Sequence, residues 1–256
     1  MRSPAQRSVD KIFTVGGLLS GGVRDEILAH GVAVEAALLE IAADDRLYAS
    51  SARGRGWAPL HAIELLGRLR SEAAIPLLLA QLDSDDFDLA FDRAHYALVA
   101  IGGAALEPCL AAHATASEEL AFSLTGVLAE LGVRDERVFQ ILVAALPEGL
   151  GFGATNLAQY GDPRALPILQ SALAGLAVAR AGELRNRDII DVCDSITELG
   201  ATLSPSEQRK LDQVRAELRA MNDDDDRAAA PRRNEACHCG SGRKYKRCHL
   251  RAQQQK

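Results

Sequence analysis

Four residues near the carboxyl end have the types and the spacing of a metal site. Cys237 and Cys239 form a Cys-x-Cys pair, and Cys248 and His249 follow after eight intervening residues. Thiolate and imidazole are donors that zinc prefers, and two closely spaced pairs supply the four ligands of a tetrahedral site. The GSG sequence between the pairs provides a tight turn. These residues predict one bound zinc ion, with iron as the alternative occupant.

The predicted site is structural. Four protein ligands leave no open position at which the metal activates water. The segment around the site has almost no aliphatic residues, so the binding energy of the metal is largely its folding energy. The other two of the five cysteines, Cys109 and Cys193, stand alone in helical patterns. We interpret both as buried packing residues without a chemical role.

Charge divides the chain unevenly. The last 26 residues carry eight Lys and Arg against Glu235 alone, whereas residues 1–230 carry 21 basic and 34 acidic residues. The tail therefore attracts anions and the rest of the chain repels them. A small zinc module needs none of these cations to fold, so the basic residues indicate contact with an anionic partner.

The sequence CHCGSGRKYKRCH closely resembles the SEC-C motif, the zinc-binding tail of the preprotein translocase ATPase SecA that also occurs on many unrelated bacterial proteins. The resemblance covers about residues 232–250. It implies that Cys237, Cys239, Cys248 and His249 are the zinc ligands. It also implies an exposed partner-binding strip, which we place at Arg243, Lys244, Tyr245, Lys246 and Arg247.

Two questions about the tail stay open at this level. His238 occupies the position where the family often has proline, so His238 is an alternative ligand to His249, although adjacent Cys-His-Cys ligation strains the turn. The resemblance implies the export chaperone SecB, a ribosomal surface or acidic phospholipid as partner. RNA binding by the tail alone is a further alternative, because Tyr245 can stack on a base.

The rest of the chain repeats a helical unit. An apolar helix that ends at a glycine is followed by a short turn and a second apolar helix, at separations of 29 to 39 residues. A glycine after a helix supplies the left-handed conformation that ends it. We therefore predict helix C-caps at Gly31, Gly67, Gly102, Gly132, Gly161 and Gly200.

Start signals follow these glycines, with Asp162 predicted as an N-cap and Pro163 in the first turn of the next helix. A helix pair of this length buries its apolar face only by stacking on neighbours. The sequence therefore predicts an all-α fold, an α-solenoid of helix pairs. The phrase YGDPRALPIL resembles HEAT repeats of the short form first noted in phycobilin lyases, over about residues 20–215. That resemblance implies a concave surface that binds a partner.

Enzymes built on such repeats are the competing interpretation. A bilin lyase or an alkylpurine DNA glycosylase resembles this stack, but a glycosylase needs a basic, aromatic-lined groove. Residues 1–230 are acidic and contain one tryptophan, Trp57. His30, His61, His95 and His113 form no recognisable dyad or triad in the sequence. Our prediction is a non-catalytic adaptor or binding protein.

The domain prediction has three parts. Residues 1–221 form the HEAT-like domain, 222–233 a flexible linker and 234–251 the zinc-binding SEC-C motif. The linker prediction rests on NDDDDRAAAPRR, which has neither an apolar stripe nor a core. No run of about 18 apolar residues is apparent, so we expect no transmembrane segment and a cytoplasmic location in a bacterium.

Overall fold

The computed structural model describes residues 3–83, 88–178 and 185–229, and every secondary-structure element in these ranges is helical. Five short segments are 3₁₀-helices: η1 (Asp10–Phe13), η2 (Gly31–Val34), η3 (Asp45–Tyr48), η4 (Glu72–Ala74) and η5 (Gly102–Ala105). The α-helices are α1 (Pro4–Val9), α2 (Gly21–Leu28), α3 (Glu35–Ala42), α4 (Trp57–Arg68), α5 (Ile75–Leu82), α6 (Asp88–Ile101), α7 (Leu106–His113), α8 (Glu118–Glu130), α9 (Glu136–Ala145), α10 (Leu150–Tyr160), α11 (Ala165–Gly175), α12 (Arg185–Glu198) and α13 (Pro205–Ala229). The fold is all-α, as predicted.

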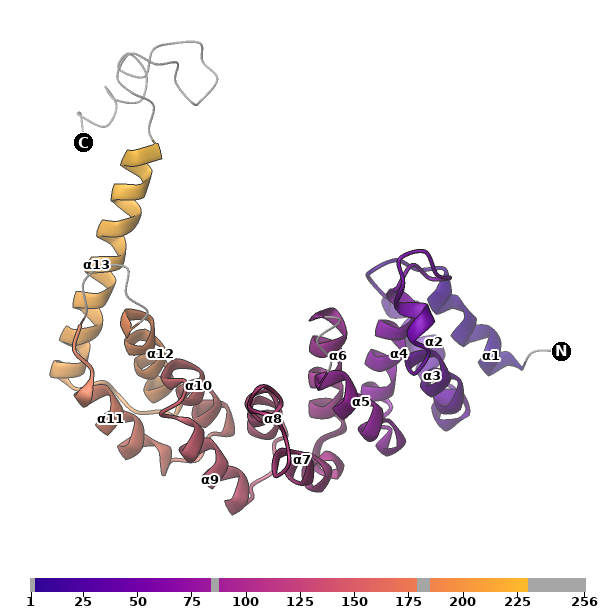
Figure 1. Ribbon diagram of the computed structural model, residues 1–256, viewed down its shortest axis with the longest axis horizontal. Helices are drawn as coiled ribbons and strands as arrows, with labels where there is room; N and C mark the ends of the chain where they lie inside the picture. Colours follow the sequence, from indigo (N-terminus) through magenta and orange to yellow (C-terminus); the bar gives the residue numbers. More distant parts are fainter. Residues whose placement is uncertain (1–2, 84–87, 179–184, 230–256) are drawn as a thin grey trace, which may run out of the picture. The chain divides into compact units, whose positions relative to one another are not determined.

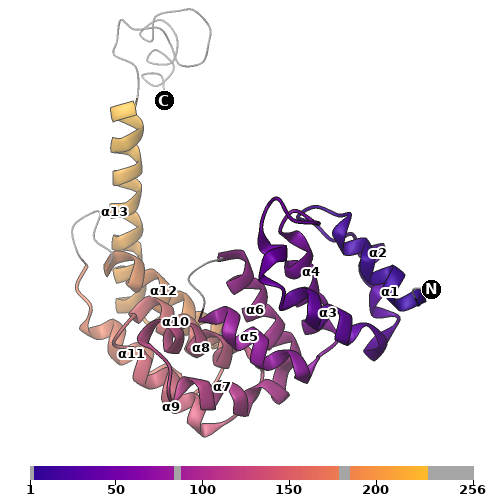
Figure 2. The same ribbon diagram turned by 45° about the vertical axis from the view of Figure 1, so that its right-hand side comes forward.

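The chain divides into two compact units, Met1–Ala165 and a second unit that begins at Leu166. In the first unit the helices alternate between two rows, as Figures 1 and 2 show. One row contains α4, α6, α8 and α10, each packed on the next, and the other contains α3, α5, α7 and α9. Helix α4 also packs on α3, α6 on α5, α8 on α7 and α10 on α9. This arrangement is the predicted α-solenoid.

Small and aliphatic side chains fill the interior of this stack. On α6 the buried apolar positions are Ala90, Ala94, Ala97, Leu98 and Ile101, which recur at spacings of three and four residues. This spacing places them on one side of the helix. Each fully buried aliphatic side chain stabilises the fold by about 1.5–3 kcal/mol relative to exposure. These buried contacts therefore fix the position of α6 against its neighbours in the stack.

Five of the six predicted glycine caps are confirmed. A positive φ angle occurs at Gly31, Gly102, Gly132, Gly161 and Gly200. At the last of these, Ala201 N donates to Ile196 O at 3.2 Å, and Gly200 N donates to Thr197 O at 3.0 Å. This is the hydrogen-bond pattern of a Schellman motif, in which glycine takes the left-handed position after the last helical turn.

The prediction for Gly67 was wrong. Gly67 lies inside α4, and a Cβ built on it would come within 2.6 Å of the Cα of Ala97 on α6. Its function is to let two helix backbones approach closely. The left-handed position that ends α4 belongs to Arg70, with a φ of 53°, and Ser71 N donates to Leu66 O at 3.0 Å.

Side-chain caps begin several helices. Ser117 accepts a hydrogen bond from Leu120 N at the start of α8. Asp162 accepts from Arg164 N at 2.9 Å, but α11 begins at Ala165, so Pro163 precedes the helix that the sequence placed it in. Asp162 thus forms a turn that leads into the helix, a common role for Asp side chains.

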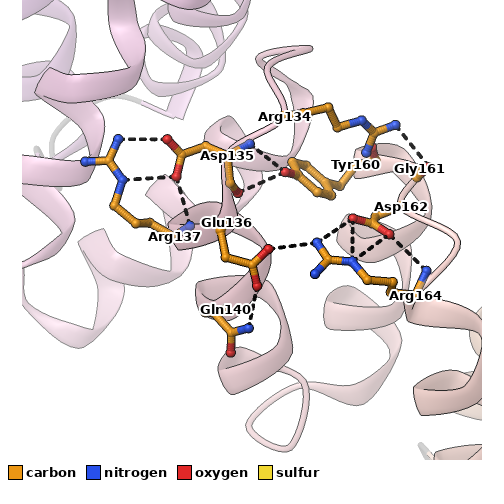
Figure 3. A network of polar contacts seen from close by, with 9 residues as sticks. All are labelled: Arg134, Asp135, Glu136, Arg137, Gln140, Tyr160, Gly161, Asp162 and Arg164. Atoms are coloured by element: carbon orange, nitrogen blue, oxygen red, sulfur yellow. Dashed lines mark hydrogen bonds and ion pairs between the residues drawn. The ribbon is translucent and has the colours of Figure 1, made fainter.

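Arginines join successive helix starts in the first unit. Asp135 caps α9 and accepts from Arg137 N at 2.8 Å, and the Arg137 guanidinium reaches Glu107 on α7 at 2.5 Å. Arg164 repeats the pattern with Glu136 at 2.9 Å (Figure 3). Exposed pairs of this kind contribute about 0–1 kcal/mol each. Their regular occurrence marks the spacing of the repeats.

In the second unit, α12 packs on α13, and Lys210 on α13 donates to the carbonyls of Leu173 and Leu176, both at 2.6 Å. A cation at these carbonyls complements the negative end of α11. Helix α13 continues to Ala229, through residues 222–229 that the sequence analysis assigned to a linker. Extending a helix costs far less than starting one, which favours this continuation.

Among the described residues, the helical stretch Leu89–His113 is long and apolar enough to cross a membrane. It is not a single α-helix. Helix α6 ends at Ile101, Gly102 has a φ of 75°, and α7 starts at Leu106 after η5. Both helices pack on neighbours in the stack, α6 on α4 and α7 on α8. This apolar stretch therefore serves as two core helices of the first unit.

Candidate functional site

The residues predicted from the tail lie outside the described part of the chain. These are the metal ligands Cys237, Cys239, Cys248 and His249, the alternative ligand His238, and the partner-binding residues Arg243, Lys244, Tyr245, Lys246 and Arg247. Three thiolates and one imidazole form a donor set that fits zinc. Within the described ranges, no group of three or more His, Cys, Asp or Glu side chains is suited to hold a metal.

The two cysteines inside the described helices are buried. Burial raises the pKa of the Cys109 thiol to about 12 and that of Cys193 to about 11. Both thiols are protonated at neutral pH, and a thiol is a poor nucleophile and metal ligand compared with a thiolate. Their predicted role as packing residues agrees with this burial.

A serine, a histidine and a glutamate do meet between α1 and α2. The Ser8 hydroxyl donates to Glu26 at 2.8 Å, and His30 Nε2 lies 3.1 Å from the same hydroxyl. A hydroxyl has one proton, so His30 must donate to Ser8 and does not accept from it. A histidine that activates serine has to accept that proton. With Ser8 only 4% exposed, this cluster joins two helices and is not a nucleophile site.

A groove lined by α6, α8 and α10, which we call the aromatic groove, is the best candidate for a binding site. It has a volume of about 350 Å³. Phe122 on α8 and Phe152 on α10 both line it, with rings stacked at 4.1 Å between centroids. They are 52% and 40% exposed, and Tyr96 on α6 is 64% exposed. Exposed aromatic side chains in a groove are typical of sites that bind other molecules.

Polar groups occupy defined places in this groove. His95 Nε2 lies 3.2 Å from Glu130 Oε1, which links α6 to α8. Asn156 on α10 is 2% exposed and lines the groove, and its Nδ2 atom has no hydrogen-bond partner among the described residues. A buried amide without a partner costs about 1–3 kcal/mol. Buried polar groups in native proteins are rarely left without a partner, so Asn156 is a feature of the groove that calls for an explanation.

Trp57, on which the glycosylase interpretation depends, lies outside this groove. Trp57 packs on a cluster of Tyr48, Leu60 and Ala90, and its ring covers Gly17 closely enough that a Cβ there would come within 2.9 Å. Trp57 therefore serves as core at the amino-terminal end of α4, and it does not line the aromatic groove. The groove itself contains the carboxylates of Asp92 and Glu130, which oppose a nucleic-acid backbone.

Sequence reasoning missed the two phenylalanines. They are 30 residues apart, and they precede Gly132 and Gly161 by ten and nine residues. In a chain with 4% aromatic residues, two phenylalanines at nearly the same offset in successive repeats are a usable signal. That offset places both on the second helix of a repeat, the row that contains α8 and α10.

Comparison with known families gives two matches. The SEC-C motif matches residues 233–251, and the PBS lyase HEAT-like repeat matches residues 153–175. The second match begins in α10 and ends with the last residue of α11. No curated protein matches the chain significantly. The chain therefore contains a SEC-C motif and a HEAT-like repeat.

Proposed function

We propose that this protein is a non-catalytic adaptor. Its HEAT-like repeats bind a protein client through the α6–α8–α10 groove, and its SEC-C tail binds one zinc ion and docks on an anionic assembly in the cytoplasm. The observation that carries the proposal is the stacked and exposed Phe122–Phe152 pair. The buried Nδ2 atom of Asn156, without a hydrogen-bond partner in the part of the chain that the structure describes, lines the same groove. Buried aromatic anchors dominate the energy of protein interfaces, and these two rings are available to a partner.

The tail supplies the second contact. The SEC-C family is associated with zinc, and the tail carries seven of its eight cations between Arg232 and Arg251. A compact basic module favours an acidic partner and speeds association with it. The resemblance to the SecA tail favours SecB or the ribosome as that partner. Acidic phospholipid and RNA are alternatives that the experiment below distinguishes.

The test compares proteins captured from a bacterial lysate by the wild-type chain, two double variants and a control variant. Phe122→Ala with Phe152→Ala removes the aromatic pair, and Cys237→Ser with Cys239→Ser removes two zinc ligands. We expect each double variant to lose a different set of partners. A matched control, Leu18→Ala with Val32→Ala, removes two apolar side chains that are 85% and 86% exposed outside the groove, and it retains both sets.

Two further measurements complete the test. Nuclease and detergent treatment of the lysate leave the tail-dependent partner bound if it is a protein, and release it if RNA or lipid holds it. A chelator releases the tail-dependent set while the far-ultraviolet helicity changes little, because the described helices contain no metal site. Identical captures by the wild-type chain and both double variants would exclude the adaptor function.

A further inference from the structure

Three arginines surround one glutamate on α4. Arg93 on α6 lies 3.0 Å from Glu64, Arg68 on α4 lies 3.2 Å away and Arg24 on α2 lies 3.7 Å away. Glu64 has a side chain that is only 17% exposed, whereas the side chains of Arg68 and Arg93 are 49% and 35% exposed. Even with Asp25, which lies 3.8 Å from Arg24, two carboxylates do not neutralise three guanidinium groups. Excess positive charge therefore remains on the surface of a strongly acidic body.

This arginine cluster lines a groove of its own. Glu64, Arg68, Arg93 and Tyr96 border a space of about 360 Å³ between α4 and α6. Tyr96 also borders the aromatic groove on the other side of α6. The two grooves are therefore neighbours that share one exposed tyrosine ring. Among the described residues, Glu64 is the carboxylate that pairs with both Arg68 and Arg93.

We infer that the two grooves together bind an extended segment of a client protein that carries an acidic residue about three positions from a large apolar residue. The inference rests on the proposed client-binding function. Arg68 and Arg93 receive the carboxylate, as they already receive that of Glu64. The Phe122–Phe152 pair receives the apolar side chain.

The spacing follows from helix geometry. Neighbouring packed helices are about 8–10 Å apart, so a ligand that crosses α6 from one groove to the next spans about that distance. An extended chain advances about 3.3 Å per residue, which makes the span about three residues. Tyr96, at the crossing point, offers a ring on which the segment rests.

Charge determines which residue of the client segment binds in which groove. Asp92 and Glu130 line the aromatic groove, and a carboxylate of the client is repelled there. In the groove between α4 and α6, guanidinium groups outnumber carboxylates. The exposed Asp25 lies 3.8 Å from Arg24, and among the described residues it forms no ion pair with Arg68 or Arg93. Arg–carboxylate bonds are charge-assisted and directional. The acidic residue therefore belongs between α4 and α6.

The test uses fluorescein-labelled synthetic peptides of Gly, Ser and Thr that contain one Glu and one Phe, with binding to the full chain measured by anisotropy. One peptide has Glu and Phe three positions apart. Others place them adjacent or six apart, replace Glu by Gln, or replace Phe by Ala. We expect the three-position peptide to bind at least fivefold more tightly than each of the others, which corresponds to about 1 kcal/mol per lost contact.

Variants assign each contact to its groove. Arg68→Gln with Arg93→Gln is combined with Glu64→Gln, so that the Glu64 carboxylate does not lose two of its three partners. This variant should abolish the preference for Glu over Gln and keep the preference for Phe over Ala. Phe122→Ala with Phe152→Ala should do the reverse. The control Arg46→Gln with Arg209→Gln removes two charges outside the grooves, and both preferences persist. Far-ultraviolet spectra and melting temperatures establish that each variant is folded.

Three outcomes overturn the inference. They are equal binding of the Glu and Gln peptides, a Glu preference that survives in the folded arginine variant, and no binding of any peptide up to its solubility limit. These outcomes differ from failure of the adaptor function. If lysate capture still depends on Phe122 and Phe152 while the Glu preference is absent, the adaptor function stands and the acidic–apolar segment does not.

Discussion

The hydroxyl of Tyr160 and the backbone of Asp135 exchange two hydrogen bonds. Asp135 N donates to the hydroxyl oxygen at 2.9 Å, and the hydroxyl donates to Asp135 O at 3.0 Å (Figure 3). Tyr160 ends α10 and is 6% exposed, and Asp135 caps the start of α9. One side chain thus bonds both backbone groups of the residue that caps the preceding helix.

Replacing Tyr160 by Phe removes both bonds and leaves the ring in place. We expect the free energy of unfolding of the repeat body to fall by about 1–3 kcal/mol, because Asp135 N loses its partner in a partly buried position. Asp135 O keeps the hydrogen bond that Phe139 N donates at 3.2 Å. Urea denaturation measures the loss. Tyr96→Phe is the matched control, since Tyr96 is 64% exposed, and it should change stability by less than about 0.5 kcal/mol.

The Asp135 cap also makes the stability of the fold depend on pH. Hydrogen bonds from the Arg137 side chain and backbone lower the pKa of Asp135 to about 2, from an ordinary value of 3.8. Because the folded pKa is the lower one, the ionised carboxylate stabilises the fold above pH 3.8, and this contribution is lost as the pH falls through about 2. Protonated Asp135 no longer attracts the guanidinium.

Asp135→Asn tests this relationship, since asparagine keeps the capping oxygen and removes the charge. We expect a lower melting temperature than wild type well above pH 3.8, and a difference that shrinks toward zero near pH 2. Arg137→Gln should show the same convergence, because it removes the other partner. A deficit that stays constant down to pH 2 in both variants would show that this ion pair does not cause the acid sensitivity.

Most of the architecture could be predicted because helix ends depend on nearby residues. The left-handed conformation required at Gly102 or Gly132 is a property of one residue and its turn. Gly67 could not be distinguished from these glycines, because its reason for being glycine is the backbone of Ala97, thirty residues away. Close approach between helices is a tertiary relationship that repeat spacing alone does not reveal.

The two candidate sites differ in the same way, because one depends on residues close together in the sequence and the other on contacts between repeats. The predicted zinc ligands lie within thirteen consecutive residues, so their spacing alone predicts a metal site. The aromatic groove draws on α6, α8 and α10, and Phe122 and Phe152 meet only when two repeats stack. Asn156 is an ordinary polar residue in the sequence, and only its burial without a partner for Nδ2 sets it apart.

Gly67→Ala tests the close approach of α4 and α6. The added Cβ would lie 2.6 Å from the Cα of Ala97 and 2.8 Å from its Cβ, so the helices must separate. We expect a loss of about 1–3 kcal/mol in the free energy of unfolding. Gly175→Ala is the control, because a Cβ there meets nothing within 4 Å at the end of α11, and alanine favours helix by up to about 1 kcal/mol. A neutral Gly67→Ala would mean that this contact tolerates a methyl group.

The five cysteines allow a test of the zinc site that needs no partner. Burial raises the pKa values of Cys109 and Cys193 to about 12 and about 11, so neither thiol supplies thiolate at neutral pH. We expect iodoacetamide to label Cys237, Cys239 and Cys248 rapidly in folded, chelator-treated protein, and to label Cys109 and Cys193 only after denaturation. Stoichiometric zinc should protect the three tail cysteines, because thiolates bound to metal react slowly.

Mass spectrometry of the labelled peptides, with elemental analysis of the same sample, measures both effects. Rapid labelling of the three tail cysteines in zinc-loaded protein would exclude them as its ligands, whereas rapid labelling of Cys109 would contradict its place in the core.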